Sequence, residues 1–177
     1  MTSYTSPPPP GAGGPRPALT GRRVLAGWWS RVGAALVDGI IIGVGGLVLV
    51  IAITAPFSIG FFASDGVGIV AVLVGLLIAV LCTSIVALFY APALMARTNG
   101  QTLGRMVAGI RVVRANGVPI DFGFAMLREV VVKVLLFGVL GTLTGGLAPL
   151  IDVLWPLWDE ENRALHDFVV NTRVIRA

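Results

Sequence analysis

The chain has 177 residues, of which 56% are hydrophobic and only 12% are charged, and its mean hydropathy is +0.91. Soluble domains carry about 25% charged residues, so this composition excludes an ordinary water-soluble enzyme and indicates that much of the surface faces lipid. The net charge of +4 does not indicate nucleic-acid binding, because the arginines flank apolar runs and are not interleaved with aromatic residues on one basic face.

The chain contains one cysteine, Cys82, and one histidine, His166. A single cysteine excludes an internal disulfide and a thiolate metal site, and a single histidine excludes a histidine cluster. We therefore expect neither a metal nor a cofactor.

Residues 1–20 are rich in proline and glycine and include a run of four prolines at positions 7–10. Such a stretch buries too little apolar surface to fold, so we predict a disordered cytoplasmic tail. Residues 21–177 are predicted to form one transmembrane domain.

The first long apolar run, residues 32–55, contains one charged residue, Asp38. With a rise of about 1.5 Å per residue, a helix of this length spans the roughly 30 Å hydrocarbon core. Trp28, Trp29 and Arg31 come just before it, as is typical of a helix end in the lipid headgroup layer. The run is too long for a secretory signal, so we predict a retained transmembrane helix.

A second apolar run, residues 67–94, has no charged residue and is also long enough to span. The link at residues 56–68 has no lysine or arginine, whereas residues 95–128 carry five arginines. Positive charge concentrates on the cytoplasmic side of the inner membrane, so we expect the N-terminus and residues 95–128 to be cytoplasmic.

Residues 109–114 alternate in part between apolar and polar side chains, and the tight-turn pair Asn116 and Gly117 follows them, before residues 118–121. This pattern predicts a short hairpin or a strand followed by a turn. Residues 168–175 also have strand character and could pair with residues 110–113. That pairing requires both segments to lie on the same side of the membrane.

The last third of the chain has two shorter apolar stretches, residues 129–140 and 147–158, around a glycine-rich segment at 141–146. They could form one interrupted helix or two short helices folded back on each other, with the turn buried or at an interface. We expect four embedded segments more than three. The predicted fold is an all-α membrane protein, a bundle of three to four transmembrane or re-entrant helices with a small cytoplasmic β element.

Three motifs occur in a fixed order along the chain. Residues 31–38 read Arg-Val-Gly-Ala-Ala-Leu-Val-Asp, residues 100–113 read Gly-Gln-Thr-Leu-Gly-Arg-Met-Val-Ala-Gly-Ile-Arg-Val-Val, and residues 165–167 read Leu-His-Asp before Thr-Arg-Val at 172–174. Together they resemble the RDD family of bacterial membrane proteins, named for one arginine and two aspartates, over about residues 25–176. The motif residues include Gly104, Arg105, His166 and Asp167.

The resemblance implies a multi-pass inner-membrane protein without enzyme activity, and transport of ions or small ligands has been proposed for the family. By this resemblance, Arg31 and Asp38 correspond to the arginine and the first aspartate for which the family is named. The second aspartate is Asp152 or Asp167, and Asp152 is preferred because it lies in an apolar stretch. Asn171 stands where the family usually has glycine, and Arg105 where lysine is common.

Charged side chains inside apolar runs cost about 2.5–3.5 kcal/mol each on insertion scales, so they mark candidate functional sites. Arg31 and Asp38 lie on one helix face, but a rise of about 10.5 Å separates them, which is too far for a direct salt bridge. We therefore hypothesise that Asp38 or Asp152 pairs with Lys133 or Arg128 across the bundle. The candidate polar network comprises Arg31, Asp38, Arg128, Lys133 and Asp152.

Two functions remain open from the sequence. In the first, the protein transports an ion or small solute along a polar path lined by Asp38 and Asp152. In the second, it is an accessory or scaffold subunit that docks through small residues at Gly39, Gly43 and Gly46, as a homo-oligomer or in a larger membrane complex. No hydrolase, nucleotide or dinucleotide motif occurs, so we expect no enzyme activity.

Overall fold

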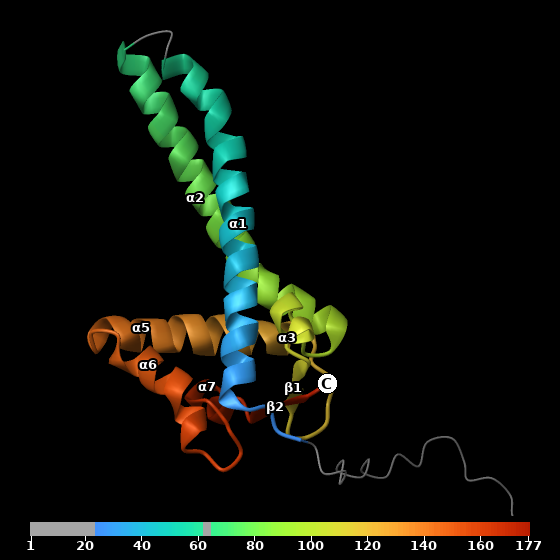
Figure 1. The fold of residues 1–177 in the computed structure, drawn as a ribbon. Helices are drawn as coiled ribbons and strands as arrows, with labels where there is room; N and C mark the ends of the chain where they lie inside the picture. The colour runs from blue at the N-terminus through green and yellow to red at the C-terminus, as the bar shows by residue number, and fades with distance from the viewer. Residues whose placement is uncertain (1–23, 62–64) are drawn as a thin grey trace, which may run out of the picture.

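Two long helices dominate the computed structural model, which describes residues 24–61 and 65–177 (Figure 1). Helix α1 (Trp28–Phe61) and helix α2 (Asp65–Thr98) lie side by side as an antiparallel hairpin. The predicted helices at 32–55 and 67–94 are confirmed, and each is longer than expected. The predicted tail at residues 1–20 lies outside the described residues.

The surfaces of both helices are strongly apolar. Within the part of the chain that the structure describes, α1 and α2 are the helices long and apolar enough to cross a membrane, by length and composition. Their most apolar stretches are barely covered by the rest of the protein, and large side chains such as Leu36, Val48 and Leu77 are about 60% exposed. Apolar surface on this scale requires a partner other than water.

The remaining elements gather around one end of the hairpin, which we call the base. They are α3 (Leu103–Val107), β1 (Ile110–Arg114), α4 (Phe122–Met126), the π-helix η1 (Leu127–Leu136), α5 (Phe137–Leu143), α6 (Leu147–Leu154), the 3-10 helix η2 (Trp155–Leu157), α7 (Leu165–Val169) and β2 (Thr172–Arg176).

A two-stranded antiparallel sheet of β1 and β2 joins distant parts of the sequence. Val112 is paired with Val174, and the backbone N–H of Ala26 donates to the Val174 carbonyl at 2.9 Å. The predicted pairing of the C-terminal segment with residues 110–113 is therefore confirmed.

The alternative of a local hairpin at Asn116 and Gly117 is wrong. Gly117 has a φ of +73° in a turn, but residues 118–121 directly after it form no strand. Pro119 has no N–H for a ladder, and the side chain of Asp121 instead caps α4 by accepting from the Phe124 N–H at 2.8 Å. The strand-and-turn interpretation is correct.

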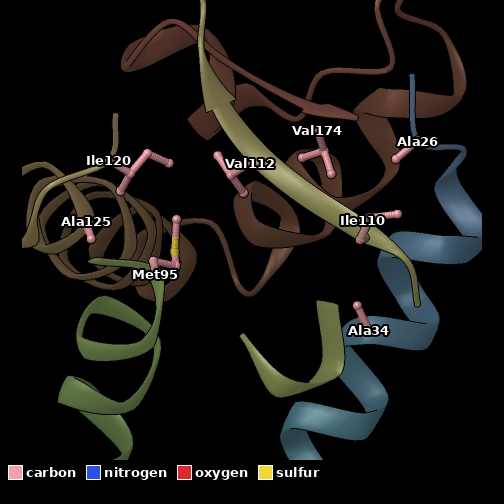
Figure 2. Close-up of a cluster of buried hydrophobic side chains, with 8 residues drawn as sticks. All are labelled: Ala26, Ala34, Met95, Ile110, Val112, Ile120, Ala125 and Val174. Carbon is pink, nitrogen blue, oxygen red and sulfur yellow. The ribbon is translucent and has the colours of Figure 1, made fainter. Parts of the chain in front are cut away.

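A small apolar core fills the space between the sheet and the helix ends (Figure 2). Met95 from α2 and Ala34 from α1 point toward side chains of the sheet, so the base is fixed to both long helices. The cluster consists of Ala26, Ala34, Met95, Ile110, Val112, Ile120, Ala125 and Val174.

The two apolar stretches of the last third form separate helices folded back on each other. Helices α4, η1 and α5 follow one another from Phe122 to Leu143, and the chain reverses at Gly145 and Gly146, both with positive φ. These helices run across the lower part of the α1–α2 hairpin (Figure 1). Of the two alternatives for this part of the chain, the pair of short folded-back helices is therefore correct, and α6 with η2 covers only Leu147–Leu157, about 16 Å of helix.

Candidate functional site: a buried charged cluster in the base

Asp167 lies at the centre of the base and is fully buried. Its Oδ2 accepts from Arg31 Nη1 at 2.7 Å and from the backbone N–H of Ala164 at 3.2 Å, and its Oδ1 accepts from Arg128 Nη2 at 2.6 Å and Thr172 Oγ1 at 2.8 Å. These contacts connect α1, η1, α7 and β2. The carboxylate therefore joins four elements that are far apart in sequence.

Burial alone would raise the pKa of Asp167, since a charge is costly away from water. The charges of Arg128 and Arg31, and the hydrogen bond from Arg128, outweigh this effect and hold the pKa of Asp167 well below its usual range. The carboxylate is therefore ionised at neutral pH.

Glu129 shares its single carboxylate among three cations. Arg105 Nη2 donates to Glu129 Oε1 at 2.7 Å, Arg128 Nη1 donates to the same oxygen, and Lys133 Nζ lies 3.5 Å from Oε2. Arg128 and Glu129 are both buried, whereas the side chain of Lys133 is 45% exposed. Arg128, Glu129 and Lys133 all lie on the π-helix η1. Such π-helical turns are rare and tend to occur at functional sites.

Asp38 is held by neutral donors only. Its Oδ1 accepts from the Tyr90 hydroxyl and the Gly104 N–H, both at 2.8 Å, and its Oδ2 accepts from the Thr102 hydroxyl at 2.5 Å. The carboxylate thus fastens α1 to α2 and to the start of α3. A Cβ at Gly104 would lie 2.1 Å from the Ala34 carbonyl oxygen, so only glycine allows this approach.

Asp152 binds the lone histidine of the chain. Its oxygens lie 2.7 Å and 3.0 Å from His166 Nδ1, and Oδ1 also accepts from the His166 backbone N–H at 2.8 Å. Arg128 Nη2 lies 3.0 Å from His166 Nε2. Because an arginine can only donate, Nε2 must accept and Nδ1 carries the proton toward Asp152.

A pocket of about 500 Å³, which we call the base pocket, opens between α1, η1 and α6. Its walls are mainly apolar, with Val32, Leu36 and Ile42 from α1 and Val153 from α6. The charged and ionisable residues on its walls are Arg31, Asp38, Tyr90, Arg105, Arg128, Glu129, Lys133, Asp152 and His166.

Arg31 uses only part of its guanidinium in this arrangement. Nη1 binds Asp167, whereas Nε and Nη2 are buried without a hydrogen-bond partner among the described residues. A buried donor left unpaired costs about 1–3 kcal/mol. An acceptor that enters the base pocket and binds Nε or Nη2 would remove this cost.

All five residues of the predicted polar network line the base pocket, but their predicted pairing is wrong. No ion pair in residues 24–61 and 65–177 joins Asp38 or Asp152 to Lys133 or Arg128. Lys133 contacts Glu129, and Arg128 contacts Glu129 and Asp167. The expectation that Arg31 and Asp38 form no direct salt bridge agrees with their separate partners.

The four motif residues also meet in the base, since Gly104 and Arg105 contact Asp38 and Glu129 while His166 and Asp167 contact Arg128. The local hydrogen-bond clasp expected around His166 is present, with Asp152 as its main partner. The carboxylate that pairs with Arg31 is that of Asp167 and not that of Asp152. The identity of the second family aspartate stays a prediction.

Sequence reasoning missed Glu129, Thr102 and Thr172 as site residues. Glu129 follows Arg128 and precedes Lys133 by four positions, a spacing that could have indicated an ion pair on one helix. The two threonines carry no comparable signal. Among the described residues, no group of three or more histidine, cysteine, aspartate or glutamate side chains is placed to hold a metal ion.

Comparison with known proteins gives one family and one relative. The model of the RDD family matches residues 25–171. An uncharacterized protein of Bacillus subtilis (strain 168), YckC, is 30% identical over 152 residues, which cover 86% of this chain and 85% of that protein. No solved structure matches the chain.

Proposed function

The chain belongs to the RDD family, and from that premise we propose that it is a multi-pass integral protein of the inner membrane with its N-terminus in the cytoplasm. The apolar, uncovered surfaces of α1 and α2 support this proposal. Each helix has 34 residues, and about 20 suffice to cross the hydrocarbon core. The base, which carries the arginines of residues 95–128, would face the cytoplasm.

Within that membrane, we propose that the protein transports a small charged solute or an ion through the base pocket. One observation carries this proposal: Arg31, Asp38, Arg128, Lys133 and Asp152 come from α1, η1 and α6, yet all line the same pocket. Ionisable groups retained in apolar segments usually serve a ligand or an ion path. The pocket would be the cytoplasmic entrance.

Transport through this fold requires more than one copy of the chain. Beyond Asp38, α1 has no charged residue up to its end at Phe61, and α2 has none between Asp65 and Arg97. One hairpin therefore offers no polar route across the bilayer. A Cβ at Gly43 or Gly45 meets nothing within 4 Å, which would let a second copy approach α1 closely.

The test begins with membrane insertion and then measures flux. The proposal expects the protein to resist extraction by alkaline carbonate and to support sodium- or proton-dependent flux in proteoliposomes. Lys133→Gln and Asp38→Asn are expected to lower that flux at least about tenfold. Lys133→Gln is the more decisive variant, because Lys133 is half exposed and loosely paired, so its loss should leave folding intact.

Arg97→Gln serves as the matched control. Arg97 is an exposed cation at the end of α2 that does not line the base pocket, so its loss should leave flux unchanged. Release of the protein by carbonate would refute the membrane location. Equal flux for the wild type, Lys133→Gln and Asp38→Asn would refute transport through the pocket.

The second candidate is a scaffold or accessory subunit. The open space beside Gly43 and Gly45 favours it as well, since these positions also suit a helix of another protein. Native mass spectrometry of the detergent-extracted protein distinguishes the two functions. A stable partner of different mass together with no flux would favour the scaffold.

A further inference from the structure

We propose that the base pocket holds the anionic headgroup of a membrane lipid, with one of its acyl chains lying along α1. The inference rests on the proposed location in a membrane but not on transport. The proposal concerns binding of the lipid and is independent of whether the lipid is also transported.

Free hydrogen-bond donors in the pocket belong to cations. Nε and Nη2 of Arg31 have no partner among the described residues, and Lys133 reaches only one carboxylate oxygen, at 3.5 Å. Four cations, Arg31, Arg105, Arg128 and Lys133, are paired with just two carboxylates, those of Glu129 and Asp167. This part of the pocket therefore favours an anion with several acceptor oxygens.

The remaining carboxylates, Asp38 and Asp152, are held by donors of the protein itself. Both oxygens of Asp38 accept hydrogen bonds, from Tyr90, Thr102 and Gly104. Both oxygens of Asp152 contact the His166 imidazole. These carboxylates are already held by donors of the protein, whereas a phosphate oxygen would supply the missing acceptor to Nε and Nη2 of Arg31.

The apolar wall identifies a lipid as the source of the anion. Leu36, Gly39 and Ile42 line the pocket from α1, and the same helix continues upward with the exposed side chains of Ile40 and Val44. An inorganic anion has no use for this surface, whereas an acyl chain buries it. Trp28 lines the pocket as well, as expected at the level of lipid headgroups.

Two glycines on different faces of α1 provide a matched pair of variants. Gly39 lines the pocket and Gly45 does not, and a Cβ at either position meets nothing within 4 Å. With about 3.6 residues per turn, Gly45 lies about 100° or more around the helix from Gly39, Ile40 and Val44. Leucine favours helix over glycine, so Gly39→Leu and Gly45→Leu should both fold. Only Gly39→Leu places an isobutyl group where the acyl chain would lie.

The measurement is lipid binding by native mass spectrometry of the full-length protein in a neutral detergent. The probes are phosphatidylglycerol, phosphatidylcholine with the same acyl chains, and glycerol phosphate as a competitor without chains. Both lipids carry the phosphate, but only phosphatidylcholine adds a quaternary ammonium, which the arginines and Lys133 of the pocket would repel. We therefore expect phosphatidylglycerol to bind at least about tenfold more tightly than phosphatidylcholine. Glycerol phosphate should compete only weakly.

The variants complete the test. Gly39→Leu should weaken phosphatidylglycerol binding at least about tenfold and Lys133→Gln about threefold to tenfold, whereas Gly45→Leu and Arg97→Gln should stay within about twofold of the wild type. Circular dichroism verifies that all four variants fold. Loss of binding in Gly39→Leu with normal binding in Gly45→Leu would support the proposal.

Three results would overturn the lipid site. They are equal binding of the two lipids, equal behaviour of the two glycine variants, and full competition by glycerol phosphate, which would show a site for a free anion. Each of these results can occur in a protein that still resists extraction by carbonate and still supports flux. Failure of the lipid site is therefore distinguishable from failure of the membrane location or of transport.

Discussion

Two carboxylates in the base, the buried Asp167 and the half-buried Asp38, are stabilised by different chemistry. Asp167 contacts two arginines and is part of a network of charges, whereas Asp38 accepts hydrogen bonds from a phenol, a hydroxyl and a backbone amide. A charge network depends on every member keeping its charge, because one unpaired member leaves a buried ion. The three donors to Asp38 are uncharged, so its contacts do not depend on a second charged side chain.

Acid should therefore destabilise the base through Asp167. Its pKa is lowered in the folded state, so its contribution to stability is present above the unfolded carboxyl value of about 4 and is lost as the pH falls toward the folded value. Between those limits the free energy of unfolding should decrease by about 1.4 kcal/mol per pH unit. Thermal melting in detergent from about pH 6 to about pH 3 measures this slope.

Asp167→Asn is the control for that slope. This variant should begin about 3–5 kcal/mol less stable at neutral pH, because it leaves Arg31 and Arg128 facing a neutral amide. Its stability should also change less with acid. If the stability of Asp167→Asn falls as steeply with pH as that of the wild type below about pH 4, another group controls acid unfolding.

Gly104 permits the contact between α3 and Asp38. Gly104→Ala would push a methyl group against the Ala34 carbonyl oxygen, at 2.1 Å, and against the Asp38 carboxylate, at 2.8 Å. We expect a loss of about 1–3 kcal/mol in the free energy of unfolding, as for other overpacked sites. Chemical or thermal unfolding followed by fluorescence measures the loss.

Gly138→Ala provides the comparison, since a Cβ there meets nothing within 4 Å in helix α5. Alanine should leave the stability unchanged or raise it by up to about 1 kcal/mol. If both glycine variants lose the same stability, the close approach at Gly104 is not the cause.

The members of the site could be predicted from the sequence, but their partners could not. Arg31, Asp38, Lys133 and Asp152 stand out because a charge in an apolar run is costly. Their contacts bridge segments as much as 136 positions apart, and no local spacing encodes such contacts. Asp167 attracted less weight than Asp152 because only Asp152 lies in an apolar stretch.

At the scale of elements, length decided what the sequence could predict. Helices α1 and α2 each come from a long apolar run, so their existence follows from composition alone. The direction of α5 and α6 does not, because short apolar stretches fit either a crossing or a re-entrant pair. Their orientation depends on contacts such as the Trp28 Nε1 donation to the Val153 carbonyl at 2.9 Å.

Helices α5 and α6 should lie at the cytoplasmic surface and not cross the bilayer. In a Cys82→Ser background, Leu143→Cys places a thiol at a side chain that is 78% exposed near the turn. A membrane-impermeant maleimide should label it in inverted vesicles and leave it unlabelled in right-side-out vesicles. Four full crossings would give the reverse pattern, because the turn would then lie outside.

Ser64→Cys in the link between α1 and α2 is the matched probe for the outer side. It should be labelled in right-side-out vesicles only. Labelling of both variants from the same side would contradict either the two-crossing arrangement or the cytoplasmic placement of the base.

At the scale of the whole molecule, the base is assembled from both ends of the described chain. The Arg176 N–H donates to the Val24 carbonyl at 2.9 Å, and Thr172 on β2 contacts both Arg128 and Asp167 in the charged cluster. The sheet and the cluster therefore form one cooperative unit, which local patterns along the sequence do not reveal. Only the pairing of β1 with β2 was predictable, from strand character in both segments.

Removal of residues 172–177 should consequently disrupt the base while leaving α1 and α2 inserted. We expect limited proteolysis from the cytoplasmic side to cut within residues 99–171 of the truncated protein and to leave the full-length base intact. Removal of Ala177 alone deletes one backbone hydrogen bond, to the Gly109 carbonyl, and should have little effect. A truncated protein as resistant as the full chain would show that β2 is dispensable.

The four tryptophans of the chain, Trp28, Trp29, Trp155 and Trp158, all belong to the base or to the first turn of α1 above it. Their intrinsic emission spectrum is accordingly a local signal. Lipid binding or acid unfolding near the charged cluster should shift its wavelength, whereas separation of α1 from α2 at the distant tip would pass unseen without an added fluorophore.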